Sequence, residues 1–191
     1  RVMAAGAAAI LRECHDEGRV QGVLGMGGSA GTTIATTAMR GLPVGVPKVM
    51  VSTLAGGNVS AYVGDSDILM LPSIVDVAGV NSISARIYTN AVAAVCGMAT
   101  ASPPDVASKP LIAASMFGNT TELVGKCKAK LEAAGYEVLV FHATGAGGRM
   151  MEKLIAEGYF VGVLDVTTTE WADELVGGVL SAGPTRLDAA A

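Results

Sequence analysis

Residues 20–33 read VQGVLGMGGSAGTT, and this stretch decides the predicted fold. A short apolar run ends in four closely spaced glycines, and a segment rich in alanine, threonine and isoleucine follows. This order is typical of a buried strand that passes through a glycine loop into a helix. At such a junction several backbone N–H groups lie at the positive end of the helix and can bind an anion, most often a phosphate.

We therefore expect the first loop to hold phosphate oxygens through backbone N–H groups and two hydroxyls. No lysine stands where a P-loop requires one, so the loop is not a Walker A motif. The residues expected to contact the phosphates are Gly27, Gly28, Ser29, Gly31 and Thr32.

Other interpretations of the same stretch stay open. Gly25-x-Gly27-x-x-Ala30 matches a relaxed dinucleotide fingerprint, but the acid expected at the end of the next strand is missing. The sequence GGSAG also matches the elbow of serine hydrolases, with Ser29 as nucleophile and with Asp76 and His142 following in the required order. A strand-to-helix turn without a ligand is the simplest alternative.

The composition is that of a compact α/β protein with buried parallel strands, being 51% hydrophobic and 16% charged. A net charge of −4 without any basic run argues against a nucleic-acid partner. Three scattered cysteines fit neither a disulfide framework nor a zinc site and favour a reducing compartment. No apolar run reaches about 18 residues and no signal peptide is recognisable, so we expect a cytoplasmic protein without a membrane partner.

Strand-like and helix-like segments alternate through both halves of the chain. Strands are expected over residues 20–24, 48–53, 67–71, 111–116, 137–141 and 160–164. Helices are expected over residues 2–17, about 29–40, 82–98, 121–134 and 149–157, and again after residue 170. This alternation predicts parallel sheets joined by right-handed crossovers.

Residues 100–109, TASPPDVASK, form the one clear linker, because two adjacent prolines and small residues interrupt both periodicities. We accordingly place a first lobe at residues 1–102 and a second lobe at residues 103–191. The chain opens inside a helical pattern and stops without a clear finish, so we expect a fragment of a longer protein.

The second lobe contains another glycine loop, in the segment HATGAGGR after a predicted strand. Its backbone donors, hydroxyl and cation are suited to phosphate oxygens. The residues concerned are Thr144, Gly145, Gly147, Gly148 and Arg149.

An acidic, hydroxyl-rich strand end follows at residues 165–170. Asp165, Thr168 and Glu170 could bind Mg²⁺ through one or two carboxylates beside phosphates. The alternative, which we favour for either carboxylate alone, is a helix cap with Glu170 in the first turn.

Five longer stretches resemble one known family. They are GVLGMGGSAGTT, GLPVGVPKVMVST, SDILMLPSIVDVAGVN, GYEVLVFHATGAGGRMMEKLI, and GVLDVTTTE with ADELVGGV. The family is the ATP-binding family typified by the N-terminal inhibitory domain of the tomato mosaic virus resistance protein. The resemblance implies two Rossmann-like lobes, with mainly parallel sheets and helices on both faces, and ATP, with or without Mg²⁺, in or near the cleft between them. It places one further loop of the family at residues 117–121, with Gly118, Asn119 and Thr120 as ligand contacts.

The resemblance also implies that a strand and loop upstream, and a segment downstream, are missing from this chain. Missing strands would expose an apolar edge, which predicts a homo-oligomer. The plant member binds a viral replication protein, so a protein-interaction module with a structural nucleotide is kept as an alternative. Whether the chain catalyses a reaction is left open.

Overall fold

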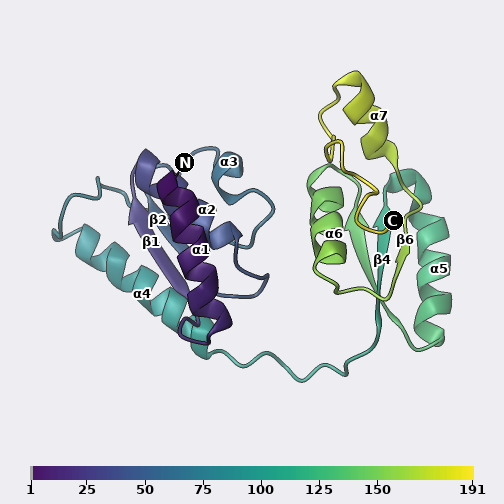
Figure 1. Ribbon diagram of the computed structural model, residues 1–191, viewed down its shortest axis with the longest axis horizontal. Helices are drawn as coiled ribbons and strands as arrows, with labels where there is room; N and C mark the ends of the chain where they lie inside the picture. The colour runs from purple at the N-terminus through teal and green to yellow at the C-terminus, as the bar shows by residue number, and fades with distance from the viewer. Residues whose placement is uncertain (1) are drawn as a thin grey trace. The chain divides into compact units, whose positions relative to one another are not determined.

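The computed structural model describes residues 2–191 and divides the chain into two compact units (Figure 1). Unit 1 spans Arg1–Pro104 and unit 2 spans Asp105–Ala191. Each unit is a three-stranded parallel sheet with helices packed on both faces, which confirms the predicted α/β class.

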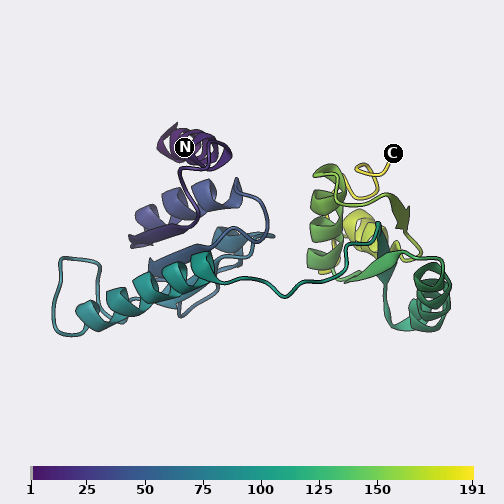
Figure 2. The same cartoon turned by 90° about the horizontal axis from the view of Figure 1, so that it is seen from below.

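Unit 1 is ordered β1-β2-β3, with β2 in the centre and buried along its whole length. Helix α2 packs on one face, α1 lies over α2, and α4 covers the opposite face (Figure 2). The elements are α1 (Val2–Asp16), β1 (Val23–Gly27), α2 (Ser29–Arg40), β2 (Lys48–Ser52), α3 (Ser60–Val63), β3 (Leu69–Pro72) and α4 (Ser84–Thr100).

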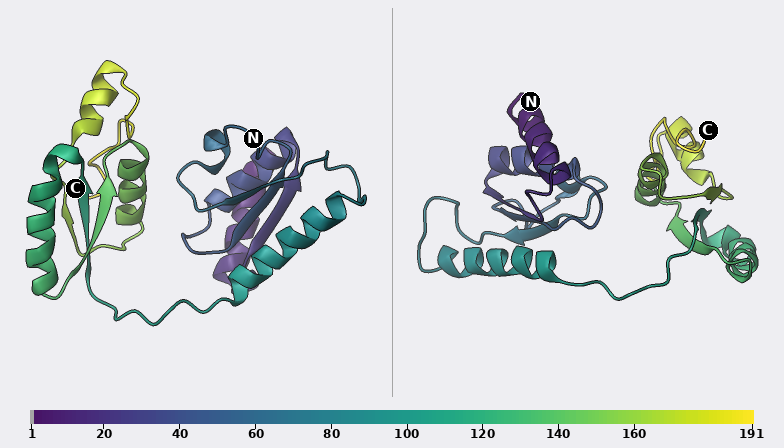
Figure 3. Two further views of the ribbon diagram at one scale, coloured as in Figure 1. Left: turned by 180° about the vertical axis from the view of Figure 1, so that it is seen from behind. Right: turned by 60° about the horizontal axis from the view of Figure 1, so that its bottom comes forward.

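Unit 2 is ordered β5-β4-β6, so that β4 lies in the centre. Helices α5 and α6 cover opposite faces of this sheet (Figure 3). The elements are β4 (Leu111–Met116), a 3₁₀ turn (Gly118–Thr120), α5 (Thr121–Ala133), β5 (Glu137–His142), α6 (Ala146–Ala156), β6 (Gly162–Leu164) and α7 (Thr169–Val176).

Small and branched apolar side chains form the two cores, as the low aromatic content requires. In unit 1, Val49 and Val51 of β2 pack against Ala91 of α4. In unit 2, Ile112 of β4 packs against Val124 of α5. Each core lies between the sheet and a helix.

The two largest differences in element boundaries from the sequence prediction both concern glycines. Strand β1 begins three residues later than predicted and continues to Gly27, because its backbone pairs with β2 up to Ser52. Helix α6 begins at Ala146 and not near Arg149, so Gly147 and Gly148 belong to its first turn.

None of the helices within residues 2–191 combines the length and apolar character that crossing a membrane requires.

Candidate functional site

The first glycine loop lies at the carboxyl edge of the unit 1 sheet and is a single residue long. Strand β1 ends at Gly27 and α2 begins at Ser29, so only Gly28 joins them. A Cβ atom on Gly27 would lie 2.8 Å from the Cα of Gly31. Close packing of the strand end on the helix start therefore requires glycine at residue 27, independently of any ligand.

The N-terminus of α2 is open to an anion from outside. Gly28 is the N-cap residue, and no side-chain cap hydrogen bond forms there. The first N–H groups of a helix have no acceptor within the helix, and Ser29 is exposed beside them. A Cβ on Gly28 would meet only the Thr53 hydroxyl, at 3.6 Å, so backbone and hydroxyl donors can be approached closely here.

Thr32 has a different place from the other residues predicted in the first loop. It is fully buried, and its Oγ1 lies 2.7 Å from the hydroxyl oxygen of Ser52 at the end of β2. Its hydroxyl also donates to the carbonyl of Gly27 at 3.4 Å. Thr32 thus fixes α2 against the sheet edge, and its hydroxyl does not reach the surface where a phosphate would lie.

A hollow of about 430 Å³ lies over the carboxyl ends of β2 and β3. Thr53 lines this hollow and also faces Gly28, so the hollow adjoins the N-terminus of α2. The lining residues are Ser52, Thr53, Gly56, Pro72, Ser73, Ile74, Val75 and Asp76.

The second glycine loop, in unit 2, already holds an anion, and that anion is Glu170. The Glu170 carboxylate is fully buried and accepts the N–H groups of Gly145 at 2.7 Å and Gly148 at 3.1 Å. A Cβ on Gly148 would overlap this carboxylate, and a Cβ on Gly147 would lie 1.9 Å from the carbonyl oxygen of His142. Close packing explains both glycines.

A buried cation completes this arrangement. The Nε of Arg186 donates to Glu170 at 2.7 Å, and its Nη1 and Nη2 donate to Asp165 at 2.5 and 2.8 Å. Burial alone would lower the pKa of Arg186, but the hydrogen bonds and charges of Asp165 and Glu170 raise it, so the guanidinium stays charged. The two carboxylates predicted to bind Mg²⁺ instead bind an internal cation.

Each oxygen of Asp165 and Glu170 already accepts at least one hydrogen bond, and Asp165 also accepts the hydroxyl of Ser115 at 2.5 Å. Glu170 caps α6 and not its own helix α7, which differs from the predicted cap. Sequence reasoning missed Arg186 altogether. The only signal was a lone arginine in an otherwise small and apolar tail.

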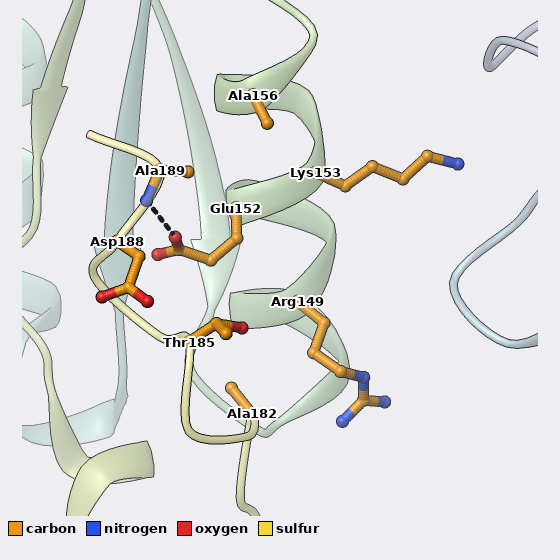
Figure 4. A pocket seen from close by; sticks show the side chains of 8 residues that line it. All are labelled: Arg149, Glu152, Lys153, Ala156, Ala182, Thr185, Asp188 and Ala189. Carbon is orange, nitrogen blue, oxygen red and sulfur yellow. Dashed lines mark hydrogen bonds between the residues drawn. The ribbon is translucent and has the colours of Figure 1, made fainter. Parts of the chain in front are cut away.

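A second hollow, of about 460 Å³, lies in unit 2 between α6 and residues 182–189 (Figure 4). The Glu152 carboxylate turns toward that segment and accepts the N–H of Ala189 at 3.0 Å. It also accepts hydrogen bonds from the N–H of Leu187 and from Nη1 of Arg186. Arg149, predicted as a phosphate contact, lies on the exposed side of α6 and donates to the carbonyl of Ser181 at 3.1 Å.

The remaining predicted residues lie at the carboxyl edge of the unit 2 sheet. Gly118 and Asn119 are exposed just beyond β4, and the Thr120 hydroxyl bonds to the backbone of Phe117. The Phe117 ring stacks on His142, with ring centroids 5.2 Å apart. Thr144 donates to the carbonyl of His142 at 3.3 Å, and Thr168 is exposed at the start of α7.

Fold and sites together define an α/β protein built from two parallel-sheet units, each with polar loops at its carboxyl edge. Residues 1–104 match the N-terminal domain, and residues 109–191 the C-terminal domain, of the uncharacterised protein family UPF0261. The chain belongs to this family, which confirms the resemblance read from the sequence.

Three relatives illustrate its range. A UPF0261 protein of Clostridium tetani is 57% identical over 190 residues, covering 99% of this chain and 47% of the relative. A UPF0261 protein of Rhizobium meliloti is 53% identical over 172 residues, covering 90% of this chain and 43% of the relative. The tomato protein "ToMV resistance protein Tm-1(GCR237)" is 43% identical over 194 residues, covering 98% of this chain and 26% of the relative. The chain thus spans about half the length of these relatives or less.

Proposed function

We propose that this chain binds a nucleotide, with ATP as the ligand, and that its phosphates lie against the N-terminus of α2. Gly28, Ser29 and Gly31 would supply the backbone and hydroxyl donors. The observation that carries the proposal is a contrast between two helix ends. Glu170 fills the N-terminus of α6, whereas no side chain within residues 2–191 caps the N-terminus of α2, which adjoins, beside Thr53, a hollow at the same sheet edge.

This proposal changes the roles expected for the second glycine loop. Gly145, Gly148, Asp165 and Glu170 serve the fold of unit 2, because their polar groups bond to one another or to Arg186. Any Mg²⁺ would arrive with the phosphates, which is the usual way this ion is held beside a nucleotide.

Several other predictions are left as they were. Gly118, Asn119, Thr144 and Thr168 stay predicted contacts. A homo-oligomer, a protein partner, the cytoplasmic location and a hydrolase using Ser29 also stay predictions.

The test is a thermal-shift titration with ATP, ADP, AMP and pyrophosphate, each with and without Mg²⁺. A ligand that binds only the folded state stabilises it by about 2.7 kcal/mol at a concentration of 100 Kd. We expect Gly28→Asp to remove this response, since its carboxylate would occupy the helix end as Glu170 does in α6. The same change adds an N-cap carboxylate, so the variant should be slightly more stable than the wild type without ligand.

The matched control is Gln21→Glu, which makes the same charge change at the opposite edge of the sheet, before β1 begins. Gln21 is exposed, and its side chain donates only to the carbonyl of Gly18. This control should keep the full response to ATP. A Gly28→Asp protein that responds to ATP as the wild type does would refute the proposed site, and a wild type that responds to no nucleotide would refute the function.

A further inference from the structure

The hollow of unit 1 contains an acid that a phosphate site does not explain. Asp76 lies on its rim, is exposed, and accepts the N–H of Val77 at 2.8 Å. Within residues 2–191 no lysine or arginine pairs with it. A carboxylate repels phosphate oxygens, so with the phosphates at α2 Asp76 must face a different part of the ligand.

The turn that carries Asp76 is strained. Ile74 has φ +65°, and the N–H of Val75 donates to the carbonyl of Ser73 at 2.7 Å, which defines the rare γ-turn with positive φ. Such a conformation costs about 1–2 kcal/mol for a side chain with a Cβ. The Ile74 side chain is 70% exposed, so its own burial does not offset this cost.

Hydrogen bonds from Ser73 hold the strained turn in place. Its N–H donates to the carbonyl of Ser52 at 3.1 Å, and its hydroxyl donates to the carbonyl of Val75 at 2.6 Å. Backbone strain that neighbouring structure maintains tends to occur at ligand sites. The turn therefore keeps Asp76 at a fixed place on the rim.

The order of the strands gives the ligand a direction. The phosphates would lie where β1 meets α2, Thr53 stands next to Gly28, and the hollow continues from Thr53 over β2 and β3 to Asp76. Ligands of parallel sheets lie along the carboxyl edge. The group next to the phosphates of a nucleotide is its sugar, so the sugar would enter the hollow.

We propose that the hollow binds the ribosyl group of the nucleotide and that Asp76 accepts hydrogen bonds from its neighbouring 2′ and 3′ hydroxyls. This assignment rests on the proposed function. A carboxylate only accepts hydrogen bonds, and its two oxygens suit two adjacent hydroxyl donors. Hydrogen bonds to a charged acceptor are about twice as strong as those between neutral groups. The volume, about 430 Å³, is also within the usual range of small-molecule pockets.

The test compares the affinities of ATP, 2′-deoxyATP and tripolyphosphate in the wild type, Asp76→Ala and Asp76→Asn, by calorimetry with Mg²⁺ present. We expect the wild type to bind ATP about tenfold or more tightly than 2′-deoxyATP, as the loss of a hydrogen bond to a charged group predicts. Asp76→Ala should bind both nucleotides equally and tripolyphosphate as the wild type does. Asp76→Asn should fall between the two, because its neutral oxygen still accepts one hydrogen bond.

A matched control is Asp105→Ala, which removes an equally exposed carboxylate from the segment between the units. It should leave all three affinities unchanged. If the wild type binds ATP and tripolyphosphate but does not distinguish 2′-deoxyATP, the ribosyl assignment is wrong and the phosphate site stands. If Asp76→Ala changes the Mg²⁺ requirement while sugar discrimination persists, Asp76 is a cation ligand and the assignment is equally wrong. If neither ATP nor tripolyphosphate binds the wild type, both proposals fail together.

Discussion

Arg186→Met is expected to destabilise unit 2 severely, because Arg186 is the only cation within residues 2–191 that pairs with a buried group of three carboxylates. Asp165, Glu170 and Glu152 all bond to the guanidinium, and their side chains are 16%, 0% and 13% exposed. Methionine fills a similar length of the site but accepts or donates no comparable hydrogen bond. The three acids would then face one another without a counter-charge.

The magnitude follows from burial. Removing one partner of a buried ion pair costs about 3–5 kcal/mol, since the remaining charge has lost both water and its partner. Three carboxylates depend on Arg186, so we expect the upper part of that range at pH 7. Because the free energy of unfolding of a typical domain is only about 5–15 kcal/mol, much of unit 2 would be unfolded at moderate urea concentrations.

The stabilising charge of Arg186 is present over the whole ordinary pH range. The pKa of Arg186 is raised in the folded protein, so its charge is present at every pH below its ordinary value and does not vary between pH 5 and 7.

The assay is urea unfolding followed by tryptophan fluorescence. Trp171 is the single tryptophan of the chain and donates from Nε1 to the carbonyl of Arg186 at 2.8 Å, so it reports on this part of unit 2. Lys126→Met is the control, because Lys126 also belongs to unit 2, forms an exposed ion pair with Glu122, and its loss should cost less than about 1 kcal/mol. A loss below about 1 kcal/mol for Arg186→Met would contradict this account.

Three further changes test other parts of the structure. Asp67→Ala should cost about 1–2 kcal/mol at pH 7, since it takes the charged partner from buried Lys48. Although burial acts to raise the pKa of Asp67, the hydrogen bond from Lys48 helps to lower it below its ordinary value. Thermal unfolding should therefore show the difference disappear as acid protonates Asp67 below the usual range of an aspartate. Gly147→Ala should unfold unit 2, because its Cβ would lie 1.9 Å from the carbonyl oxygen of His142 in β5. Its control is Gly125→Ala on α5, where a Cβ has open space. This control should raise the free energy of unfolding, measured by tryptophan fluorescence, by about 0.5–1 kcal/mol. Ile74→Gly should leave unit 1 as stable as the wild type or up to about 1 kcal/mol more stable in calorimetry, because it relieves the positive φ.

Local chemistry explains what the sequence could predict. Gly28 ends the strand pattern and Ser29 begins the helical one, so α2 was predicted with the bounds that the structure has. The apolar run of β4 and its end at Met116, shortly before Gly118, were equally clear. Each of these boundaries is determined by residues that are close together in the sequence, within a single turn or a single strand. The parallel pairing followed from the alternation of elements alone.

Contacts between distant residues explain what the sequence could not predict. The start of α6 was misplaced because Gly147 and Gly148 have the composition of a loop, while the reasons for their glycines lie at His142 and Glu170. Arg186 lies 16 residues from Glu170 and 34 from Glu152, and no short motif connects them. A pattern of donors and acceptors indicates that an ion can be bound, but it does not say whether the chain itself supplies that ion.

That distinction bears directly on where a ligand can bind. The acids at residues 165–170 do bind a cation, which is Arg186, and the second glycine loop does bind an anion, which is Glu170. Both sites of unit 2 were therefore read with the right chemistry, and both are filled from within the chain. At the N-terminus of α2 no side chain caps the helix, and Asp76 stands across the adjoining hollow without a cationic partner within residues 2–191. The proposed ribonucleotide would bring an anionic group to α2 and neutral hydrogen-bond donors to Asp76 on adjacent parts of one molecule.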